Sequence, residues 1–346
     1  MKANMKNKQI IFTEPNRAEL LETECPDTPN EGMVRVRMTY TAISAGTERA
    51  NLIGEINISG KREGCNDHFP RMLGYCGVGV VDAIGDRVAK VAVGERVIVY
   101  FGKHALYNTV PEANVIPILP REVDDLDAAL MVIAGFPAEG VRKTRLEYGE
   151  SCMVVGLGIL GQIAVALAKI AGAVPVIAAD PNPKRRELAL KMGADLAVDF
   201  SDAHAAESIR EATGGKGVNV IVEASGNSGA LKTSLRCCAP MARVSLLGCT
   251  RTPDVYDLYH DVHYPGVSLI GAHNFARPKV ESMPGNWTAA DDFHAMLRLI
   301  HYGRLNLRPL ISEIHDPAEA PQVYERLAFD RDFPIGVLFD WRETRI

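Results

Sequence analysis

A glycine-rich turn near the middle of the chain constrains the fold more than any other feature. Residues 153–161 read Met-Val-Val-Gly-Leu-Gly-Ile-Leu-Gly and lead into Ile163–Ile170, an apolar segment with helical spacing. In such a strand–turn–helix setting, Gly156 permits the tight turn, Gly158 lets a pyrophosphate approach the backbone, and Gly161 allows helix and strand to pack closely. The helix N-terminus adds free N–H donors. The sequence therefore predicts a dinucleotide site whose members are Gly156, Gly158, Ile159, Leu160 and Gly161.

An acidic residue at the end of the next apolar run indicates which dinucleotide is bound. Asp180 follows Val174–Ala179, about 20 residues beyond the glycines, where a carboxylate accepts from both ribose hydroxyls and repels a 2′-phosphate. We therefore expect NAD rather than NADP. Arg185 and Arg186 begin the following helix; Arg185 is a candidate cofactor contact, both could accommodate a phosphate, and a solvated helix start is the alternative.

Length and composition limit the class of protein. The 346 residues are 47% hydrophobic and 23% charged, which is typical of a globular enzyme with two domains. The net charge of −5 comes without a basic block, which argues against nucleic acid as a partner. No apolar run reaches about 18 residues, and Met1–Gln9 is polar. We therefore expect neither a membrane span nor a signal peptide, and a cytoplasmic protein. The scattered cysteines indicate reduced, buried thiols.

The first third of the chain contains short alternating strands broken by Gly, Pro and Asn turns, which predict an all-β, barrel-like domain. These strands are Val34–Met38, Val78–Ile84, Arg96–Tyr100 and Ala105–Val110. Helical spacing follows between Asp124 and Arg145.

Short apolar strands then alternate with helix-period segments, the pattern of a doubly wound parallel sheet. They are Cys152–Val155, Val174–Ala179, Leu196–Asp199, Val218–Glu223, Ala242–Leu247 and Ser268–Gly271. A linker, Arg277–Thr288, precedes a helix, Ala289–Tyr302, and a strand, Ile335–Phe339, that we expect to return to the first domain. The predicted class is α/β, with a β-barrel substrate domain (1–123 and 289–346), a Rossmann domain (124–288), and a substrate cleft between them.

The length and the order of elements resemble the medium-chain dehydrogenase/reductase family over nearly the whole chain. Ala42–Glu48 lies where that family has a Cys-Gly-Thr-Asp turn, and Gly74–Gly79 lies where it has a Gly-His-Glu segment. Gly94–Val97 is similar to the family's strand-entry motif. Glu223–Gly226 and Leu247–Gly248 match strand ends that line the cofactor in the family. The Ser-Ala-Gly-Thr-Glu turn also looks like that of the zinc-free branch that contains bacteriochlorophyllide dehydrogenases.

This resemblance implies a GroES-like β-barrel catalytic domain beside the Rossmann sheet. It also implies cofactor contacts at Ser225, Gly248 and Ala272. A homodimer or homotetramer, joined by edge pairing near Val267–Gly271, is implied as well.

Zinc members of the family hold a catalytic zinc with a cysteine, a histidine and a third cysteine or acid. The matching positions here are Ala45, Tyr75 and Ala134. Two methyl groups and a phenol cannot supply three donors. The structural zinc lobe is also missing, because Tyr100–Pro120 contains no cysteine. We therefore expect a zinc-free protein.

One other metal interpretation stays open. Cys65, His68 and Cys76 offer three possible ligands within twelve residues, although no fourth donor follows at a fixed interval. His260 and His263 invite a similar idea, and exposed polar residues before a strand are the alternative.

Without a metal, side chains have to take the hydroxyl proton and stabilise the developing alkoxide. Tyr75 is the first candidate, as a general base with a pKa lowered by Lys103 or His104; the alternative is a space-filling residue that orients substrate. Thr47 matches the hydroxyl that relays protons in zinc members. Glu48 matches the acid beside it, and an ion pair with a neighbouring arginine is its alternative role.

Polar residues after the last parallel strand are candidate substrate contacts. In the family this strand runs beside the nicotinamide, so the resemblance places His273 and Asn274 near the reacting carbon. Trp287 could add an aromatic face of the kind that sugar sites use; the alternative is a capping side chain on a surface loop.

The sequence thus predicts an NAD-dependent alcohol dehydrogenase that acts, without zinc, on a secondary hydroxyl of a polyol, sugar or polar cyclic alcohol. A zinc-free quinone or enoyl reductase using NADPH is one alternative. A catalytically silent nucleotide-binding protein is the other.

Overall fold

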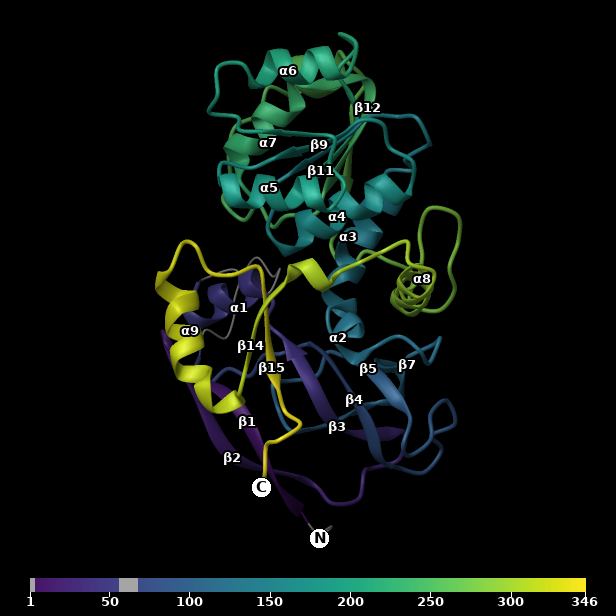
Figure 1. Ribbon diagram of the computed structural model, residues 1–346, viewed down its shortest axis with the longest axis vertical. Coiled ribbons are helices and arrows are strands. Elements are labelled where there is room, and N and C mark those ends of the chain that lie inside the picture. Colours follow the sequence, from purple (N-terminus) through teal and green to yellow (C-terminus); the bar gives the residue numbers. More distant parts are fainter. Residues whose placement is uncertain (1–3, 56–67) are drawn as a thin grey trace. The chain divides into compact units, whose positions relative to one another are not determined.

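The computed structural model describes residues 4–55 and 68–346, and the chain forms two compact units (Figure 1). The β-rich unit comprises Met1–Val132 and Met296–Ile346, and the parallel-sheet unit comprises Ile133–Ala295. The two boundaries between the units, after Val132 and after Ala295, lie later in the chain than the predicted ones, after residues 123 and 288. The reason is that the helices α3 (Met131–Lys143) and α8 (Ala289–His301) each pass from one unit into the other.

Within the described residues, the β-rich unit has a seven-stranded mixed sheet and a separate hairpin. The sheet order is β14-β15-β3-β4-β5-β7, with β6 paired to β3. The bounds are β3 Met33–Ala42, β4 Cys76–Ile84, β5 Arg96–Tyr100, β6 Tyr107–Pro111, β7 Val115–Pro117, β14 Ile311–His315 and β15 Gly336–Asp340; the hairpin is β1 Asn4–Glu14 and β2 Arg17–Pro26. The four strands predicted in this region are present: β3 and β4 are longer than predicted, β5 has the predicted bounds, and β6 begins at Tyr107 instead of Ala105.

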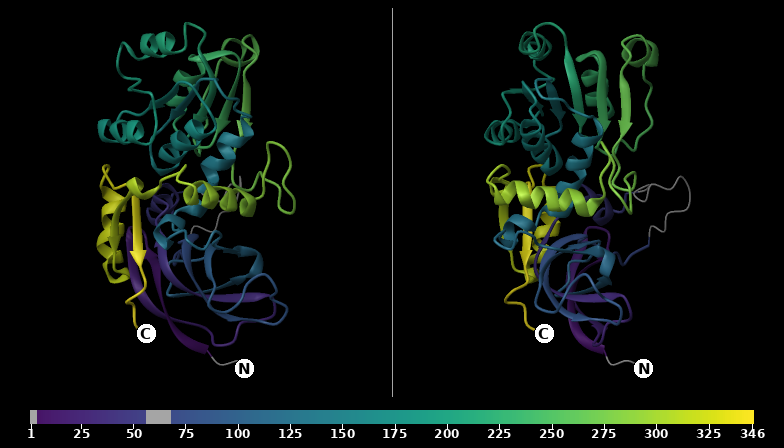
Figure 2. Two further views of the ribbon diagram at one scale, coloured as in Figure 1. Left: turned by 45° about the vertical axis from the view of Figure 1, so that its right-hand side comes forward. Right: turned by 90° about the vertical axis from the view of Figure 1, so that its right-hand side faces the viewer.

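The C-terminal segment of the chain completes the β-rich unit. Strand β15 pairs antiparallel with β3 and parallel with β14, which confirms the predicted return of the last strand. Helix α9 (Ala320–Phe329) packs on β2 and on α1 (Ala45–Leu52). Figure 2 shows these yellow elements beside the purple N-terminal strands. The sequence analysis missed the helices α1 and α9 and, among the strands of this unit, β1, β2, β7 and β14.

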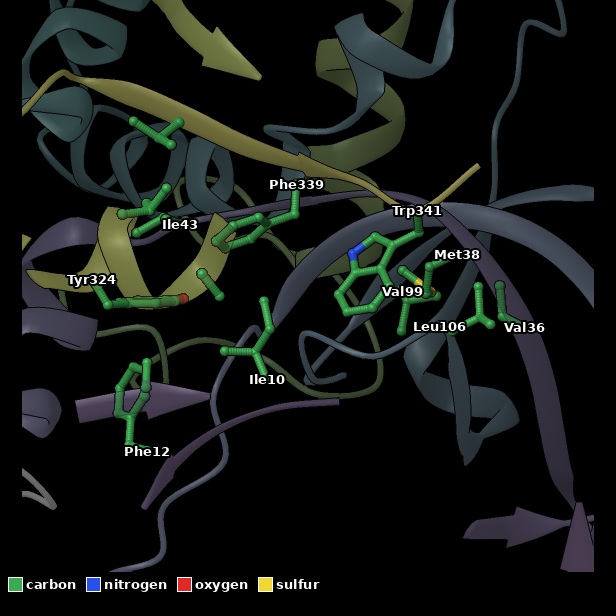
Figure 3. Close-up of a cluster of buried hydrophobic side chains, with 14 of the residues drawn as sticks. Ile10, Phe12, Val36, Met38, Ile43, Val99, Leu106, Tyr324, Phe339 and Trp341 are labelled. Carbon is green, nitrogen blue, oxygen red and sulfur yellow. The ribbon is translucent and has the colours of Figure 1, made fainter. Parts of the chain in front are cut away.

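Aromatic side chains from distant parts of the sequence meet in the largely aliphatic core of the β-rich unit (Figure 3). The ring of Tyr324 on α9 lies 4.8 Å from that of Phe12 on β1 and 5.9 Å from that of Phe339 on β15. Trp341 is fully buried, and its indole N–H donates to Thr41 Oγ1 at 2.9 Å. Burying each such side chain contributes about 2–3 kcal/mol, so the C-terminal elements are held by the N-terminal strands.

The parallel-sheet unit, described throughout, has the strand order β10-β9-β8-β11-β12-β13. The strands are β8 Cys152–Val155, β9 Val176–Ala179, β10 Leu196–Val198, β11 Val218–Glu223, β12 Cys238–Leu246 and β13 Ser268–Gly271. The helices between them are α4 Ile159–Ile170, α5 Pro183–Lys191, α6 Ala205–Ala212 and α7 Ser228–Leu235 (Figure 1). This order reverses between β8 and β11, the switch point at which Rossmann sheets bind ligands, and it confirms the predicted α/β class.

Local chemistry explains where several elements begin. Pro175 has no N–H to give to a ladder, and β9 starts at Val176 rather than at the predicted Val174. The helical segment from Asp124 divides into α2 (Asp125–Ala128) and α3, and the Asp124 carboxylate caps α2 by accepting from the Leu126 N–H at 2.8 Å. In residues 4–55 and 68–346, no helix has the length and apolar character needed to cross a membrane.

Candidate active site

The glycine turn between β8 and α4 has the geometry that the fingerprint requires. Gly156 has a φ of +86°, and a Cβ there would lie 2.6 Å from the backbone nitrogen of Ser225. A Cβ on Gly161 would lie 1.8 Å from the carbonyl oxygen of Gly156. Gly158 differs, because a Cβ added to it would meet no atom within 4 Å. The space before the helix N-terminus is therefore open, as a pyrophosphate requires. The first residues of the helix are Ile159 and Leu160.

Asp180 lies directly after β9 and is buried, with 6% of its surface exposed. Its carboxylate accepts from the backbone N–H groups of Leu157, at 2.7 Å, and Asn182, at 2.8 Å. These bonds fix the carboxylate beside the glycine turn. A carboxylate has about four lone-pair sites, so acceptor capacity remains for ribose hydroxyls.

The two arginines of α5 have different surroundings. Arg185 Nη1 lies 4.0 Å from the Asp180 carboxylate, and the Arg185 carbonyl accepts from Gln162 Nε2 at 2.8 Å. Arg186 Nη1 donates to the Asp180 carbonyl at 2.7 Å and to the Asp199 carboxylate at 3.2 Å. Protein acceptors thus hold Arg186, while Arg185 lies next to the candidate ribose site.

The loops after β11 and β12 form one tight backbone layer. The buried Glu223 carboxylate accepts from the N–H groups of Ser225, at 2.8 Å, and Gly226, at 3.3 Å, and from the Ser225 hydroxyl. Burial raises the pKa of Glu223. A Cβ on Gly248 would lie 2.3 Å from the Gly226 nitrogen. The candidate cofactor contacts Ser225 and Gly248 therefore lie together at the carboxyl ends of the strands.

The segment after β13 is anchored to α3. Lys143 Nζ donates to the carbonyl oxygens of Gly271, at 3.1 Å, and Ala276, at 2.6 Å. The predicted contacts lie within this anchored segment. Ala272 is buried, His273 is exposed and Asn274 is half-buried.

The side chain of Trp287 packs against Arg142 within the parallel-sheet unit. The guanidinium of Arg142 lies 3.6 Å from the centre of its ring, and Arg142 also donates to the buried Asp292 carboxylate at 2.8 Å. Because a cation covers one face of the indole, only the other face is left for a sugar.

The three positions at which the resemblance implies zinc ligands do not supply a ligand set. Ala45 in α1 and Ala134 in α3 end in methyl groups, and Tyr75 precedes β4. Over the described ranges 4–55 and 68–346, no group of three His, Cys, Asp or Glu side chains is arranged to hold a metal ion. A phenol and two methyl groups do not fit a catalytic zinc, and we derive no step through one.

The alternative metal residues do not gather in the part of the chain that the structure describes. Cys65 lies outside the described residues. His68 is exposed, whereas Cys76 is buried and its thiol donates to the Ala129 carbonyl at 3.0 Å. This contact agrees with a packing role for Cys76.

Tyr75 lies among hydroxyl groups. Its phenol donates to Ser44 Oγ and also hydrogen-bonds the Thr47 side chain. Burial raises the pKa of Tyr75 above its ordinary value, and these hydroxyls offset only part of the effect. The predicted lowering of this pKa is therefore wrong. A phenol that stays protonated is a hydrogen-bond donor at neutral pH and not a general base.

Glu48 and His104 belong to a buried network rather than to an open surface, with exposed fractions of 0% and 1%. Glu48 Oε2 accepts from His104 Nε2 at 3.1 Å and from the Tyr324 hydroxyl at 2.6 Å. Glu48 Oε1 accepts from the Ser44 N–H at 2.9 Å, and His104 Nδ1 lies 2.7 Å from Thr41 Oγ1. The sequence analysis expected Glu48 and His104 to act directly on the substrate. The structure corrects this, because both side chains are buried inside the β-rich unit and cannot touch a substrate.

The expectation that Lys103 or His104 places a cation beside Tyr75 is also wrong. The ring nitrogens of His104 face Thr41 and Glu48, and Lys103 is exposed with its Nζ 3.6 Å from the Met72 sulfur. Sequence reasoning missed two members of the site, Ser44 and Tyr324. Ser44 could have been found, because a serine directly before a helix is a common N-cap.

Comparison with known proteins identifies relatives of the chain. The profile of a family described as zinc-binding dehydrogenase matches residues 160–293. The chain is 30% identical to the D-guloside 3-dehydrogenase of Escherichia coli K12, over 92% of this chain and 95% of that protein. It is 28% identical to the L-threonine 3-dehydrogenase of Pyrococcus horikoshii, over 88% of this chain and 90% of that protein.

A solved structure shares the fold. It is described as a short chain alcohol dehydrogenase from Escherichia coli CFT073 complexed with the cofactor NADH. The TM-score is 0.81 at 23% identity, covering 97% of this chain and 99% of that one.

Two alanine substitutions in the glycine turn separate binding from folding. Gly158→Ala adds a methyl group to open space at an allowed φ of −68°, so we expect an unchanged melting temperature and about tenfold weaker NADH binding, since the methyl fills the pyrophosphate space. Gly161→Ala should lower the melting temperature, because its Cβ collides with backbone. Thermal unfolding and NADH fluorescence titration measure both. Equal NADH affinity in Gly158→Ala and the wild type would contradict the assignment.

Proposed function

Because the chain belongs to the zinc-binding dehydrogenase family of medium-chain dehydrogenases/reductases, we propose that it transfers hydride between a secondary alcohol and NAD without a catalytic zinc. Membership makes it a nicotinamide-dependent oxidoreductase of the alcohol dehydrogenase type. The zinc-free part is supported by the cluster of hydroxyls formed by Tyr75, Ser44 and Thr47, because the resemblance puts Tyr75 at the position of a zinc ligand.

The names of the relatives and the side chains of the candidate contacts both support a polar substrate. The names of the two relatives give dehydrogenation at position 3 of a guloside and of threonine. The candidate contacts Thr47, His273 and Asn274 are hydrogen-bonding side chains at exposed or half-buried places. We therefore propose a polyol, a sugar or a polar cyclic alcohol as the substrate class.

NAD rather than NADP is supported by the fixed carboxylate of Asp180. A 2′-phosphate would meet this negative charge, whereas the two ribose hydroxyls of NAD can donate to it. The nearby Arg185 sits 4.0 Å from the same carboxylate, which balances part of that charge without removing the acceptor.

The proposed chemistry uses Tyr75 as a hydrogen-bond donor. A nicotinamide, when bound, accepts the hydride from the carbinol carbon. Hydroxyl hydrogens rotate freely, so Ser44 can donate to the phenol oxygen while the phenol proton turns to the substrate oxygen. That donor stabilises the negative charge that develops on the oxygen. Thr47 is exposed, and its hydroxyl provides a route for the alcohol proton to water.

We also propose a homodimer or homotetramer formed through the edge of the parallel sheet. β13 is the last strand of that sheet, and Leu269 in it is 41% exposed. An unpaired apolar edge favours pairing with a second copy.

A substrate panel tests the proposed function. Polyols, aldoses, inositols and aromatic alcohols are supplied with NAD or NADP, in the presence of a chelator, and NADH absorbance is followed. We expect turnover of a polar alcohol with NAD that survives chelation. Loss of turnover on chelation would contradict the zinc-free mechanism. A preference for NADPH with quinones or enones would favour the reductase alternative, and cofactor binding without turnover of any compound would indicate a silent protein.

Removing the phenol hydroxyl should slow the chemical step. Tyr75→Phe is expected to lower kcat by about 10²-fold with the KM for NAD unchanged, whereas Tyr302→Phe, at an exposed tyrosine, should be neutral. Since the pKa of Tyr75 is raised, the phenol stays protonated through its ordinary pKa of about 10. The wild-type rate profile should therefore show no limb from phenol ionisation below that pH. A wild-type kcat in Tyr75→Phe would contradict the donor role.

Asp180→Ser should relax the choice of cofactor. We expect kcat/KM for NAD to fall about tenfold and that for NADP to rise, because the charge that repels a 2′-phosphate is removed. Glu187→Gln on the exposed side of α5 removes the same charge and serves as the control. Unaltered discrimination in Asp180→Ser would count against this assignment.

A further inference from the structure

A buried carboxylate in the β-rich unit is surrounded by donors from three elements. Glu48 lies in α1, His104 precedes β6, and Tyr324 comes from α9, and each of these side chains is at most 1% exposed. The donors are the Ser44 N–H, the His104 ring and the Tyr324 hydroxyl. A charged group in such a place needs all of its hydrogen bonds. Figure 3 shows Tyr324 in the same packed cluster as Phe12 and Phe339.

The hydrogen-bond partners determine where the protons lie. An indole N–H only donates, so Thr41 Oγ1 accepts from Trp341 at 2.9 Å. The Thr41 proton is then free to point at His104 Nδ1, 2.7 Å away. His104 Nε2 faces the Glu48 carboxylate, which only accepts, so Nε2 carries a proton and donates it to Glu48. Every member of the network then has a hydrogen-bond partner.

The network reaches the proposed active site through Ser44. This serine is the N-cap of α1, yet its side chain makes no capping hydrogen bond to the helix. Its hydroxyl pairs with the Tyr75 phenol instead, and its backbone N–H is held by Glu48 Oε1. Serines at this position normally cap the helix. Helix α1 lacks that capping bond, and the Glu48 carboxylate holds the serine through its backbone N–H.

We propose that Glu48, His104 and Tyr324 are positioning residues for the dehydrogenase reaction. They fix the backbone of Ser44 and thereby hold the Tyr75 phenol in the orientation that presents its proton to the substrate oxygen. The inference rests on the proposed function of Tyr75. It assigns a task to a buried polar network that none of the proposed catalytic steps uses directly.

Tyr324→Phe tests the proposal with a small change. The ring that packs 4.8 Å from Phe12 is kept, while one donor to Glu48 is lost. We expect kcat to fall about tenfold. NADH binding should be unchanged, because the candidate cofactor residues belong to the parallel-sheet unit. The NMR signal of ¹³Cζ-labelled Tyr75, assigned with Tyr75→Phe, should shift.

Val323→Ala is the matched control. Val323 is the neighbouring residue on α9, is 2% exposed and belongs to the same core, but it has no polar atom in the network. It should lower the melting temperature while leaving kcat at moderate temperature and the Tyr75 signal as in the wild type.

Glu48→Gln provides a second, independent readout. A glutamine amide offers one acceptor and one NH₂ group, so the group that faces His104 Nε2 becomes a donor. The His104 proton should then move to Nδ1, and ¹⁵N NMR of the histidine ring reports this change of tautomer. A wild-type His104 without a proton on Nε2 would overturn the hydrogen bond to Glu48 and the proposal with it.

The outcomes separate this inference from the proposed function. A wild-type kcat and an unmoved Tyr75 signal in Tyr324→Phe overturn the positioning role. Equal losses of kcat in Tyr324→Phe and Val323→Ala overturn it too, since stability alone then explains them. A shifted Tyr75 signal in Tyr324→Phe, together with wild-type turnover in Tyr75→Phe, supports the positioning role and contradicts the proposed function of the phenol.

Discussion

The carboxylate of Glu48 has to keep its hydrogen-bond donors, because it lies where water does not reach. Losing one hydrogen bond to a buried charged group costs about 1.5–3 kcal/mol, so the three donors around Glu48 are a strict constraint on the unit. They tie α1 to the loop before β6 and to α9. The return of the chain to the first unit is thereby fixed by polar contacts as well as by the aromatic core. The same constraint sets the position of Ser44, and through it the hydroxyl pair with Tyr75.

Carboxylates perform a related task in the parallel-sheet unit. Asp180 and Glu223 each follow or end a parallel strand, and each accepts from backbone N–H groups of adjoining turns. Backbone N–H groups in tight turns have few intrinsic partners, and a carboxylate satisfies two of them at once. The hydrogen bonds to these carboxylates therefore fix the turns that would contact a cofactor before any ligand binds. Preorganised turns avoid the entropic cost of ordering loops on binding.

Local patterns in the sequence predicted the parts of the molecule that local chemistry determines. The glycine turn, the strands beside it and Asp180 depend on residues close together in the chain, and they lie where they were expected. Contacts between distant residues could not be predicted in this way. Tyr324 lies 276 residues from Glu48 and His104 lies 56 residues from it, and nothing in either segment indicates that they meet. The direction of the Tyr75 pKa shift was missed for the same reason, because burial is a property of the folded chain.

The proposed mechanism puts a phenol in place of a metal, which would change what the rest of the site has to do. A metal ion lowers the pKa of a bound hydroxyl and stabilises the developing alkoxide with full charge. A neutral phenol gives only a hydrogen bond, and the loss of one such donor in enzymes costs about 3–4 kcal/mol of transition-state stabilisation. The difference has to come from positioning, since correct placement of the reacting groups can lower a barrier by about 7–11 kcal/mol. Substrates with several hydroxyl groups supply binding contacts away from the reacting carbon, and those contacts can be used to hold it in place. If the proposed zinc-free site on Tyr75 holds, it favours polyhydroxylated substrates over simple alcohols and requires rigid support of the phenol for turnover.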